Sequence, residues 1–388
     1  MKIAVVVNCL KIGGMERVAV NLSDAFHNDG HSTDLIYLKN RKKEVIPRNV
    51  DLPVHLFNLK KAVLSTGIGA IWFVFCKLLN LLFKKTFPLC FAYAESYFFK
   101  KKLAQLEAKN GQPFDLIVFR GQGTFEHLWP IDDPRYIYVC ESVQSKYRYG
   151  KLSQYIFSKL FNNRKIACVS DGAHDSFLDM MNTHNLTPEK LLTISNPNDF
   201  YQIEQESNSD EVLHPRPYLL GLGRLVPNKN FSLLIEAYSY AIKHYDIKQD
   251  LVIVGAGKDL NTIKEKIIEL NIAERVYLKG QQSNPFPWYK QADLFILSSK
   301  SEGLGMVLIE ALACKTKVVS TDCKGGVRQI MNDQLATFLA KETPEMLAEK
   351  MNLALNTEWD NTFNSCVEKT LHRFDAKVII NQYLKEFL

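Results

Sequence analysis

The sequence lacks the features that mark several protein classes. Its 19 glycines and 14 prolines in 388 residues are too few for a collagen-like or low-complexity protein. The cysteines are scattered, with no Cys-x-x-Cys and no close Cys/His cluster, which argues against both a disulfide framework and a zinc site. We expect buried thiols in a reducing compartment. The eight cysteines are Cys9, Cys76, Cys90, Cys140, Cys168, Cys314, Cys323 and Cys366.

Long apolar runs are also missing. The longest candidate, residues 62–76, has 15 uncharged residues and ends at Lys77, whereas a spanning helix needs about 20. The amino terminus has a short apolar run, Ile3 to Val7, which is too short for the core of a signal peptide and predicts a buried first strand. We therefore expect a cytoplasmic chain that rests on a membrane without crossing it.

The positive charge is concentrated in one segment. The chain carries a net charge of +6, yet residues 60–102 alone hold eight lysines against Glu95, a surplus of +7. Aromatic residues are interleaved with these lysines: Trp72, Phe73, Phe75, Phe83, Phe87, Phe91, Tyr93 and Phe99. Such a surface is typical of contact with anionic lipid headgroups, to which each lysine contributes about 1 kcal/mol. The alternative is a core-packing helical pair with a solvated lysine face. No RNA- or DNA-binding motif accompanies the charge, so nucleic acid is not an expected partner.

Short apolar runs alternate with amphipathic segments along the whole chain. This pattern predicts an α/β protein with parallel sheets that are covered on both faces. A polar stretch at 198–217, which ends in Pro-Arg-Pro, is the best linker. The sequence thus predicts two doubly wound units in tandem, with an apolar and basic insertion at 60–105. Facing each other, two such domains would hold a ligand in a central cleft between their strand ends.

A first candidate site is the segment 298–310, where a strand ends at Leu297 and a helix begins near Gly305. Backbone N–H groups at the start of that helix suit a phosphate. Glu302 could accept hydrogen bonds from sugar hydroxyls, and Glu310, inside the helix, could reach a ribose. The plainer interpretation is an ordinary strand-loop-helix with one capping and one surface glutamate.

A second candidate site is the segment 221–230, after the first strand of the second unit. Arg224 and Lys229 lie five positions apart on its glycine-rich loop, and a guanidinium and an ammonium there could hold a diphosphate without a metal. Two solvated cations beside a turn would look the same. A tight turn at Gly255 and Gly257 follows the next strand and is a weak signal alone.

The order and spacing of these elements resemble the retaining glycosyltransferases of the GT-B fold, in particular the family called group 1 or group four. The matching motifs are Gly13-Gly14-Met15-Glu16, Asn196-Pro197-Asn198-Asp199, Gly223-Arg224…Lys229, Gly255-x-Gly257, Glu302-Gly303-x-Gly305…Glu310 and Thr321-Asp322…Gly325-Gly326…Arg328…Ile330. The resemblance is dense over 218–332 and looser over 1–200.

The resemblance implies two Rossmann-like domains. Residues 1–200 would form the acceptor-side domain, completed by a C-terminal helix at 372–388, and residues 201–371 would bind the nucleotide sugar. The reaction would move a sugar, most plausibly UDP-linked, to a glycan or lipid-linked acceptor in bacterial surface-glycan synthesis, on the cytoplasmic face of the inner membrane. An epimerase or phosphorylase on the same fold, or a catalytically silent membrane-associated glycan-binding protein, are the alternatives.

The resemblance also implies roles for individual residues. Arg224 and Lys229 would stabilise the leaving diphosphate, Glu302 would position the donor sugar, and Glu310 would bind the ribose. Neither a cofactor nor a metal is expected, because the chain has no Asp-x-Asp. The other implied positions are Gly13, Gly14, Gly223, Gly255, Gly303, Leu304, Gly305 and Met306 for the donor or diphosphate, Lys279, Gly280 and Gln281 for the base, and Glu16, Arg120 and Glu141 on the acceptor side.

One departure concerns the acceptor side. Many relatives have a histidine after the fourth or fifth strand of the first domain, where this chain reads Tyr138-Val139-Cys140-Glu141. Glu141 is the candidate replacement. His127 is close in sequence but is interpreted as a structural residue.

Overall fold

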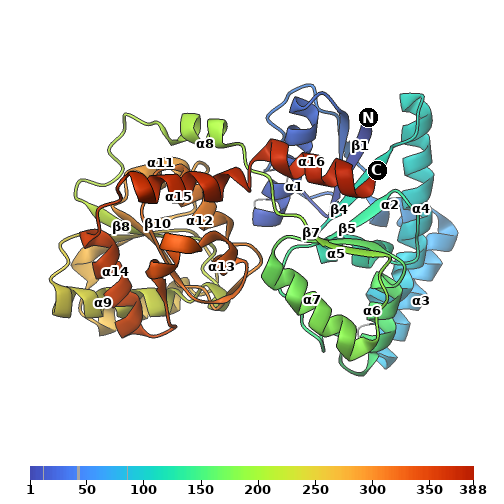
Figure 1. The fold of residues 1–388 in the computed structure, drawn as a ribbon. Coiled ribbons are helices and arrows are strands. Elements are labelled where there is room, and N and C mark those ends of the chain that lie inside the picture. The colour runs from blue at the N-terminus through green and yellow to red at the C-terminus, as the bar shows by residue number, and fades with distance from the viewer. Residues whose placement is uncertain (12, 42–43, 85) are drawn as a thin grey trace. The chain divides into compact units, whose positions relative to one another are not determined.

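The computed structural model describes residues 1–388 except residues 12, 42, 43 and 85, and it divides the chain into two compact units (Figure 1). Unit 1 comprises Met1–Asn198 and Ala376–Leu388, and unit 2 comprises Asp199–Asp375. The sequence predicted the divisions at 200/201 and 371/372, so the observed boundaries differ by two and four residues. Lys85, a member of the predicted basic segment, lies outside the described residues.

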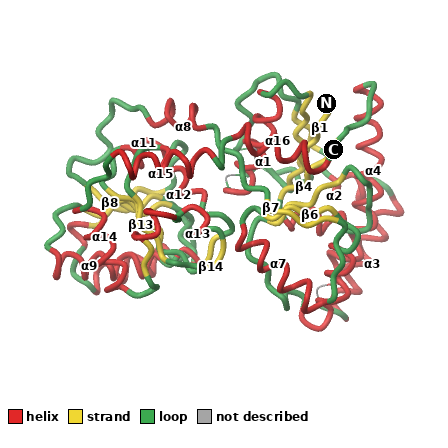
Figure 2. Tube along the Cα trace, viewed as in Figure 1, coloured by secondary structure: helices red, strands yellow, loops and turns green. Residues whose placement is uncertain are grey.

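Unit 1 is built on a parallel sheet of seven strands in the order β3-β2-β1-β4-β5-β6-β7. The strands are β1 (Lys2–Val7), β2 (Ser32–Tyr37), β3 (Val54–Leu56), β4 (Leu116–Arg120), β5 (Tyr136–Cys140), β6 (Lys165–Cys168) and β7 (Lys190–Thr193). The central strands β1, β4 and β5 are buried along their whole length, as continuous apolar runs require when helices cover both faces. Figure 2 shows this sheet between helices.

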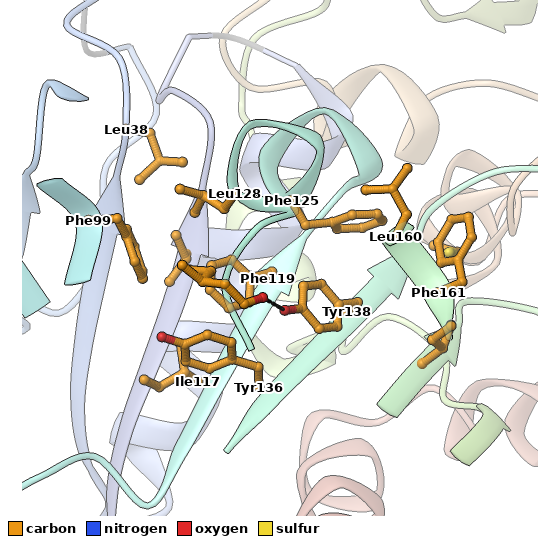
Figure 3. Close-up of a cluster of buried hydrophobic side chains, with 14 of the residues drawn as sticks. Leu38, Phe99, Ile117, Phe119, Phe125, Leu128, Tyr136, Tyr138, Leu160 and Phe161 are labelled. Carbon is orange, nitrogen blue, oxygen red and sulfur yellow. Dashed lines mark hydrogen bonds between the residues drawn. The ribbon is translucent and has the colours of Figure 1, made fainter. Parts of the chain in front are cut away.

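The helices of unit 1 complete an aromatic core. They are α1 (Gly14–Asn28), α2 (Leu59–Leu64), α3 (Gly67–Leu82), α4 (Thr86–Asn110), α5 (Gln122–Phe125), α6 (Ser153–Phe161), α7 (Asp171–His184) and α16 (Ala376–Phe387). Figure 3 shows part of this core, in which Phe119 stacks on Tyr138 with ring centroids 5.4 Å apart. Tyr138 Oη donates to the Ile131 carbonyl at 3.4 Å, so the buried hydroxyl has a partner.

The insertion forms a basic hairpin, the name used below for α3 and α4. The inner face of α3 packs on α4: Trp72 Nε1 donates to the Cys90 carbonyl at 3.3 Å, and Phe73 meets Phe91 edge-on. The outer face of α3 is apolar and exposed at Ile68, Ile71, Phe75, Leu78 and Leu82. Spacings of three and four residues place these side chains on one stripe. No helix among the described residues is both long and apolar enough to cross a bilayer.

Unit 2 has a parallel sheet of six strands in the order β10-β9-β8-β11-β13-β15. The strands are β8 (Tyr218–Leu222), β9 (Asp250–Val254), β10 (Val276–Gly280), β11 (Leu294–Leu297), β13 (Val318–Thr321) and β15 (Leu339–Ala340). A separate pair joins β12 (Ser301–Glu302) to β14 (Lys324–Gly325). The main helices are α8 (Phe200–Ser207), α9 (Phe231–Tyr245), α10 (Leu260–Glu269), α11 (Phe286–Lys290), α12 (Met306–Ala313), α14 (Pro344–Asn356) and α15 (Asn361–His372).

Helix α8 lies inside the segment that the sequence analysis interpreted as a linker. Asp199 caps it by accepting a hydrogen bond from the Gln202 N–H at 3.0 Å, and Ile203 is buried. The helix is short and otherwise polar, so it produces too weak a periodicity to be recognised in the sequence. The extended connection is therefore confined to residues 208–217.

Candidate functional site

The predicted donor residues flank the place where the strand order of unit 2 reverses. Chain order runs β8, β9, β10 toward one edge and then returns to β11 beside β8, so the loops after β8 and β11 are neighbours. In open parallel sheets, ligands bind at this reversal, beyond the carboxyl ends of the strands. Arg224 and Lys229 follow β8, and Glu302 follows β11. The fold therefore brings together two candidate sites that the sequence separates by about 75 residues.

Lys229 and Glu302 form an ion pair across these two loops. Lys229 Nζ lies 2.5 Å from Glu302 Oε1, and the side chains are only 16% and 11% exposed. Ser299 Oγ donates to the same carboxylate oxygen. A hydrogen bond between charged groups in a half-buried place fixes both side chains. The pair therefore presents one oriented ammonium and one oriented carboxylate at the reversal.

The two loops are also joined independently of that ion pair. Asn228 Nδ2 donates to the Ser301 carbonyl at 2.7 Å, and Ser301 Oγ donates to Asn228 Oδ1 at 2.9 Å. The backbone N–H of Lys300 donates to the Asn228 carbonyl at 2.8 Å, and Ser298 Oγ donates to the Lys229 carbonyl at 2.9 Å. These contacts hold the loops together whether or not Lys229 and Glu302 remain paired.

Gly255 explains why the predicted glycine turn tolerates no side chain. It has φ +152°, and a Cβ built on it would lie 1.9 Å from the Gly223 carbonyl oxygen. The turn after β9 therefore packs directly on the loop after β8. Gly305, in the left-handed region at φ +100°, forms the N-cap of α12, so Gly303, Leu304 and Met306 lie at the start of that helix.

Arg224 and Glu310 occupy different environments. Arg224 is exposed, and within the described residues its guanidinium has no hydrogen bond or ion pair. Glu310 lies half-buried on α12 and accepts a hydrogen bond from Tyr289 Oη at 3.1 Å. Among the described residues, Arg224 is thus a cation without a partner, close to the point where the strand order reverses. Glu310, in contrast, is held in one orientation by Tyr289.

The segment predicted to contact the base ends β10. Gly280 and Gln281 are exposed, and the Gly280 carbonyl accepts from the Gly255 N–H at 2.8 Å. The Lys279 ammonium lies 5.7 Å from the centre of the Trp288 ring. These residues share the carboxyl edge of the sheet with the Arg224 and Lys229 loop, with β9 between them.

In unit 1, the predicted donor residues Gly13 and Gly14 lie close to Glu16, which was predicted on the acceptor side. The Glu16 carboxylate covers Gly13, because a Cβ on Gly13 would lie 2.3 Å from Glu16 Oε2. Gly14, the first residue of α1, has open space where a Cβ would stand. Glu16 also accepts from Cys9 Sγ at 3.5 Å.

Arg120 is fully buried at the end of β4. It contacts Glu141 Oε1 at 2.6 Å, Asn196 Oδ1 at 2.5 Å and Tyr383 Oη of α16 at 3.2 Å. Burial raises the pKa of Glu141, although Arg120 and Asn196 act in the opposite direction. Arg120 therefore binds other parts of unit 1, and Glu141, with 15% of its side chain exposed, is the most exposed of its three partners.

The sequence analysis missed a row of three hydrogen-bonded side chains in unit 1, Lys39, His127 and Glu95, called the polar chain below. Lys39 Nζ lies 2.9 Å from His127 Nε2, and His127 Nδ1 lies 3.0 Å from Glu95 Oε2. Lys39 follows β2, His127 lies in a 3₁₀ turn after α5, and Glu95 is buried on α4. Burial lowers the pKa of Lys39. His127 was interpreted as a lone structural residue, and no local sequence signal links it to Lys39, 88 positions away.

Metal-ligand side chains do not cluster in the part of the chain that the structure describes: it contains no group of three or more His, Cys, Asp or Glu residues that could hold an ion. The eight cysteines are free thiols: five are buried and three are half-buried. The buried ones are Cys9, Cys76, Cys140, Cys168 and Cys314, and the half-buried ones are Cys90, Cys323 and Cys366.

Comparison with known proteins identifies the second unit. Residues 202–373 match the family model described as "Glycosyl transferases group 1". This unit is a group 1 glycosyltransferase domain. The match contains all of the donor-side candidates from Gly223 to Glu310. The two units together have the GT-B fold, with a parallel α/β sheet in each.

Curated relatives include bacterial glycosyltransferases. One, from Campylobacter jejuni, is an N-acetylgalactosamine-N,N'-diacetylbacillosaminyl-diphospho-undecaprenol 4-alpha-N-acetylgalactosaminyltransferase, 37% identical over 155 residues. That match covers 40% of this chain and 41% of the relative, so the chain aligns with less than half of that protein's length. An uncharacterized glycosyltransferase of Haemophilus influenzae is 22% identical over 356 residues, covering 90% of this chain and 89% of the relative.

Solved structures support the fold of the whole chain. HepE from Anabaena, in complex with UDP, superposes with a TM-score of 0.71 at 17% identity and covers 99% of both chains. TarM of Staphylococcus aureus, in a complex that includes UDP, gives a TM-score of 0.71 at 16% identity and covers 100% of this chain and 99% of its own. At identities of 16% and 17%, this similarity shows only that the two units of the chain share the fold of these proteins.

Proposed function

We propose that this protein is a retaining glycosyltransferase that moves a hexosyl or N-acetylhexosaminyl group from a UDP-sugar to a glycan or lipid-linked acceptor during bacterial surface-glycan synthesis. The observation that carries the proposal is the half-buried Lys229–Glu302 pair at the strand reversal of a group 1 domain. The UDP bound to structural neighbours and the diphospho-undecaprenol in a relative's name support the choice of donor and acceptor.

The chemistry follows from where charge develops. Cleavage of the bond between a sugar's anomeric carbon and a diphosphate leaves positive charge on the ring and negative charge on the phosphate. The Lys229 ammonium, the Arg224 guanidinium and the N–H groups at the start of α12 would stabilise the leaving diphosphate. Glu302 would accept hydrogen bonds from the donor sugar and Glu310 from the ribose. The acceptor would attack from the leaving-group face and pass its proton to a phosphate oxygen, which retains the anomeric configuration.

We further propose that transfer needs neither a metal nor a cofactor. Two side chains, Arg224 and Lys229, would provide the positive charge that a divalent cation supplies in metal-dependent transferases. Arg224 has no competing partner among the described residues, so its guanidinium is available to a diphosphate. Lys229 is oriented before the donor arrives, which lowers the cost of ordering its side chain.

The acceptor is proposed to be presented by an anionic bilayer, on which the basic hairpin rests. Five large apolar side chains form the exposed stripe of α3, from Ile68 to Leu82, and they range from 50% to 85% exposed. Exposed lysines occur in the same segment of the chain, at Lys60, Lys61, Lys77, Lys84, Lys100 and Lys101. Positive charge around an apolar stripe suits anionic headgroups above acyl chains. The protein would then be peripheral on the cytoplasmic face of the membrane.

Vesicle co-sedimentation tests this docking. Replacing Ile71 and Leu78 with Asn removes apolar area that contributes roughly 1.5–3 kcal/mol per fully buried side chain, so binding to phosphatidylglycerol vesicles should fall at least tenfold. Ile268→Asn on α10 is the matched control, because that side chain is 69% exposed in unit 2. Equal binding of the double variant and the control would refute the docking. Loss of a dimer in sedimentation velocity, with vesicle binding intact, would assign the stripe to a second copy instead.

A nucleotide panel tests the donor proposal. UDP, GDP, ADP and their sugar conjugates are compared by thermal shift on the wild type, on Glu310→Ala and on Glu349→Ala, an exposed glutamate of α14. A ligand at 100 times its Kd stabilises a protein by about 2.7 kcal/mol. We expect UDP compounds to stabilise the wild type and the Glu349 variant more than the Glu310 variant. Stabilisation by none of the nucleotides would favour a silent glycan-binding protein, and donor turnover without an acceptor would favour an epimerase.

A further inference from the structure

The polar chain Lys39–His127–Glu95 has no role in the function proposed above. Its hydrogen bonds show which group holds which. Glu95 is 4% exposed, so its carboxylate requires a partner, and His127 Nδ1 lies 3.0 Å from it. The Nδ1–H donates to the carboxylate, which leaves the Nε2 lone pair to accept from the Lys39 ammonium at 2.9 Å. The buried carboxylate thus fixes the imidazole, and the imidazole fixes the lysine.

Lys39 keeps donor capacity beyond this contact. An ammonium has three N–H groups, and within the described residues only His127 forms a hydrogen bond with it. Burial lowers the pKa of Lys39, which shows that the charge is poorly solvated where it stands. Arg41, exposed on the same loop, lies close enough to disfavour the Lys39 charge further. The carboxylates of Glu95 and Glu126 act on the pKa of Lys39 in the opposite direction. An anion bound beside Lys39 and Arg41 would offset both the burial of the ammonium and the repulsion between the two cations.

The polar chain Lys39–His127–Glu95 is in direct contact with the basic hairpin. Glu95 lies on α4, the inner helix of the hairpin, and Trp129, two residues after His127, donates from Nε1 to the Leu89 carbonyl of α4 at 3.2 Å. The next residue of α4, Cys90, accepts from Trp72 of α3. Direct contacts therefore run from the exposed helix α3 through α4 to His127 and Lys39, all within unit 1.

We propose that Lys39, with Arg41 beside it, is a phosphate-binding subsite for the diphosphate of a lipid-linked acceptor, and that His127 and Glu95 are positioning residues for Lys39. This inference rests on the proposed function, because it names the group by which that function's acceptor is held. A carrier lipid in a bilayer that contacts α3 would bring its diphosphate to Lys39, since α3 packs on α4 and Glu95 of α4 holds His127. The described part of the loop after β2 carries two cations, Lys39 and Arg41, which match an anionic ligand in charge.

Binding of farnesyl diphosphate to the full chain, measured by calorimetry with the donor site saturated by UDP, tests the subsite. A hydrogen bond to a charged group contributes roughly 1.5–3 kcal/mol, so Lys39→Met should weaken binding about 10- to 100-fold. Lys243→Met, an exposed lysine at the end of α9, is the matched control and should bind as the wild type does. Farnesol, which lacks phosphate, should not distinguish Lys39→Met from the control. Equal affinity of both variants for farnesyl diphosphate would overturn the proposal.

Two further arms identify the roles. His127→Ala should weaken farnesyl diphosphate binding, and His127→Gln, whose amide oxygen can still accept from Lys39, should restore most of it. A fall in Tm for both variants without that rescue would mean that His127 is only structural. Phosphatidylglycerol vesicles without carrier lipid distinguish the phosphate source: if Lys39→Met sediments with them less than the control does, the bound phosphate belongs to headgroups, and the carrier assignment fails. UDP binding in the same samples reports separately on the donor proposal.

Discussion

Separating the Lys229–Glu302 pair tests the donor site most sharply, because its two partners should respond in opposite ways. Lys229→Met removes the ammonium proposed to hold the diphosphate. A charge-assisted hydrogen bond contributes roughly 1.5–3 kcal/mol, so the Kd for UDP should rise about 10- to 100-fold. Glu302→Gln removes the charge that binds Lys229 at 2.5 Å in the absence of ligand, and so leaves the ammonium freer for the diphosphate.

The Glu302→Gln variant should therefore bind UDP at least as tightly as the wild type while its kcat for sugar transfer falls, since the carboxylate is proposed to hold the donor sugar. The loops should keep their conformation, because Asn228 and Ser301 join them without the ion pair. Calorimetry with UDP measures the first effect, and transfer at saturating donor measures the second. If Glu302→Gln weakens UDP binding as much as Lys229→Met does, the pair is a structural unit and the reasoning is wrong.

The other predictions concern packing, protonation and metal dependence. Gly255→Ala should lower the free energy of unfolding by about 2–4 kcal/mol, because its Cβ would meet the Gly223 carbonyl, whereas Gly280→Ala, at φ +68° in open space, should cost about 1 kcal/mol. Equal losses in urea would contradict the close approach. Because burial raises the pKa of Glu141 above 4.5, the folded chain holds this proton longer than the unfolded chain. Its contribution to stability is then fully present below pH 4.5 and is lost as the pH rises through the folded pKa. Glu141→Gln should flatten that part of the urea-derived pH profile, and a constant offset from the wild type would refute the assignment. EDTA should leave the rate of transfer within twofold, and a tenfold loss that Mg²⁺ or Mn²⁺ restores would contradict a metal-free reaction.

Much of the fold was predictable because buried parallel strands are continuous apolar runs. Strand β1 begins one residue before the predicted run from Ile3 to Val7, and β11 ends at Leu297 as predicted. The adjacency of β8 and β11 follows from the doubly wound order. The strands that were missed, such as β3 and β15, have only two or three residues and are partly exposed, so they leave no apolar run to detect. A strand could thus be predicted from its own residues wherever it is fully buried.

The candidate site was predictable only where its residues share a loop or motif. Gly223, Arg224 and Lys229 belong to one loop, so their proximity follows from sequence, but the distance between Lys229 and Glu302 depends on how two loops pack. The same holds for Lys39 and His127, which only the tertiary structure brings together. Arg120 was expected beside the acceptor, yet burial against Tyr383 of α16 shows it binding protein groups. The roles proposed for the donor residues stay predictions until they are measured.

The most direct test of the central claim is a transfer reaction followed by NMR at the anomeric proton of the product. The full chain is incubated with UDP-GlcNAc or UDP-GalNAc and a short prenyl-diphosphate saccharide. The account predicts that UDP is released only when the acceptor is present, and that the α-configured donor yields an α-linked product. A β-linked product, or release of UDP that does not depend on the acceptor, would contradict retaining transfer.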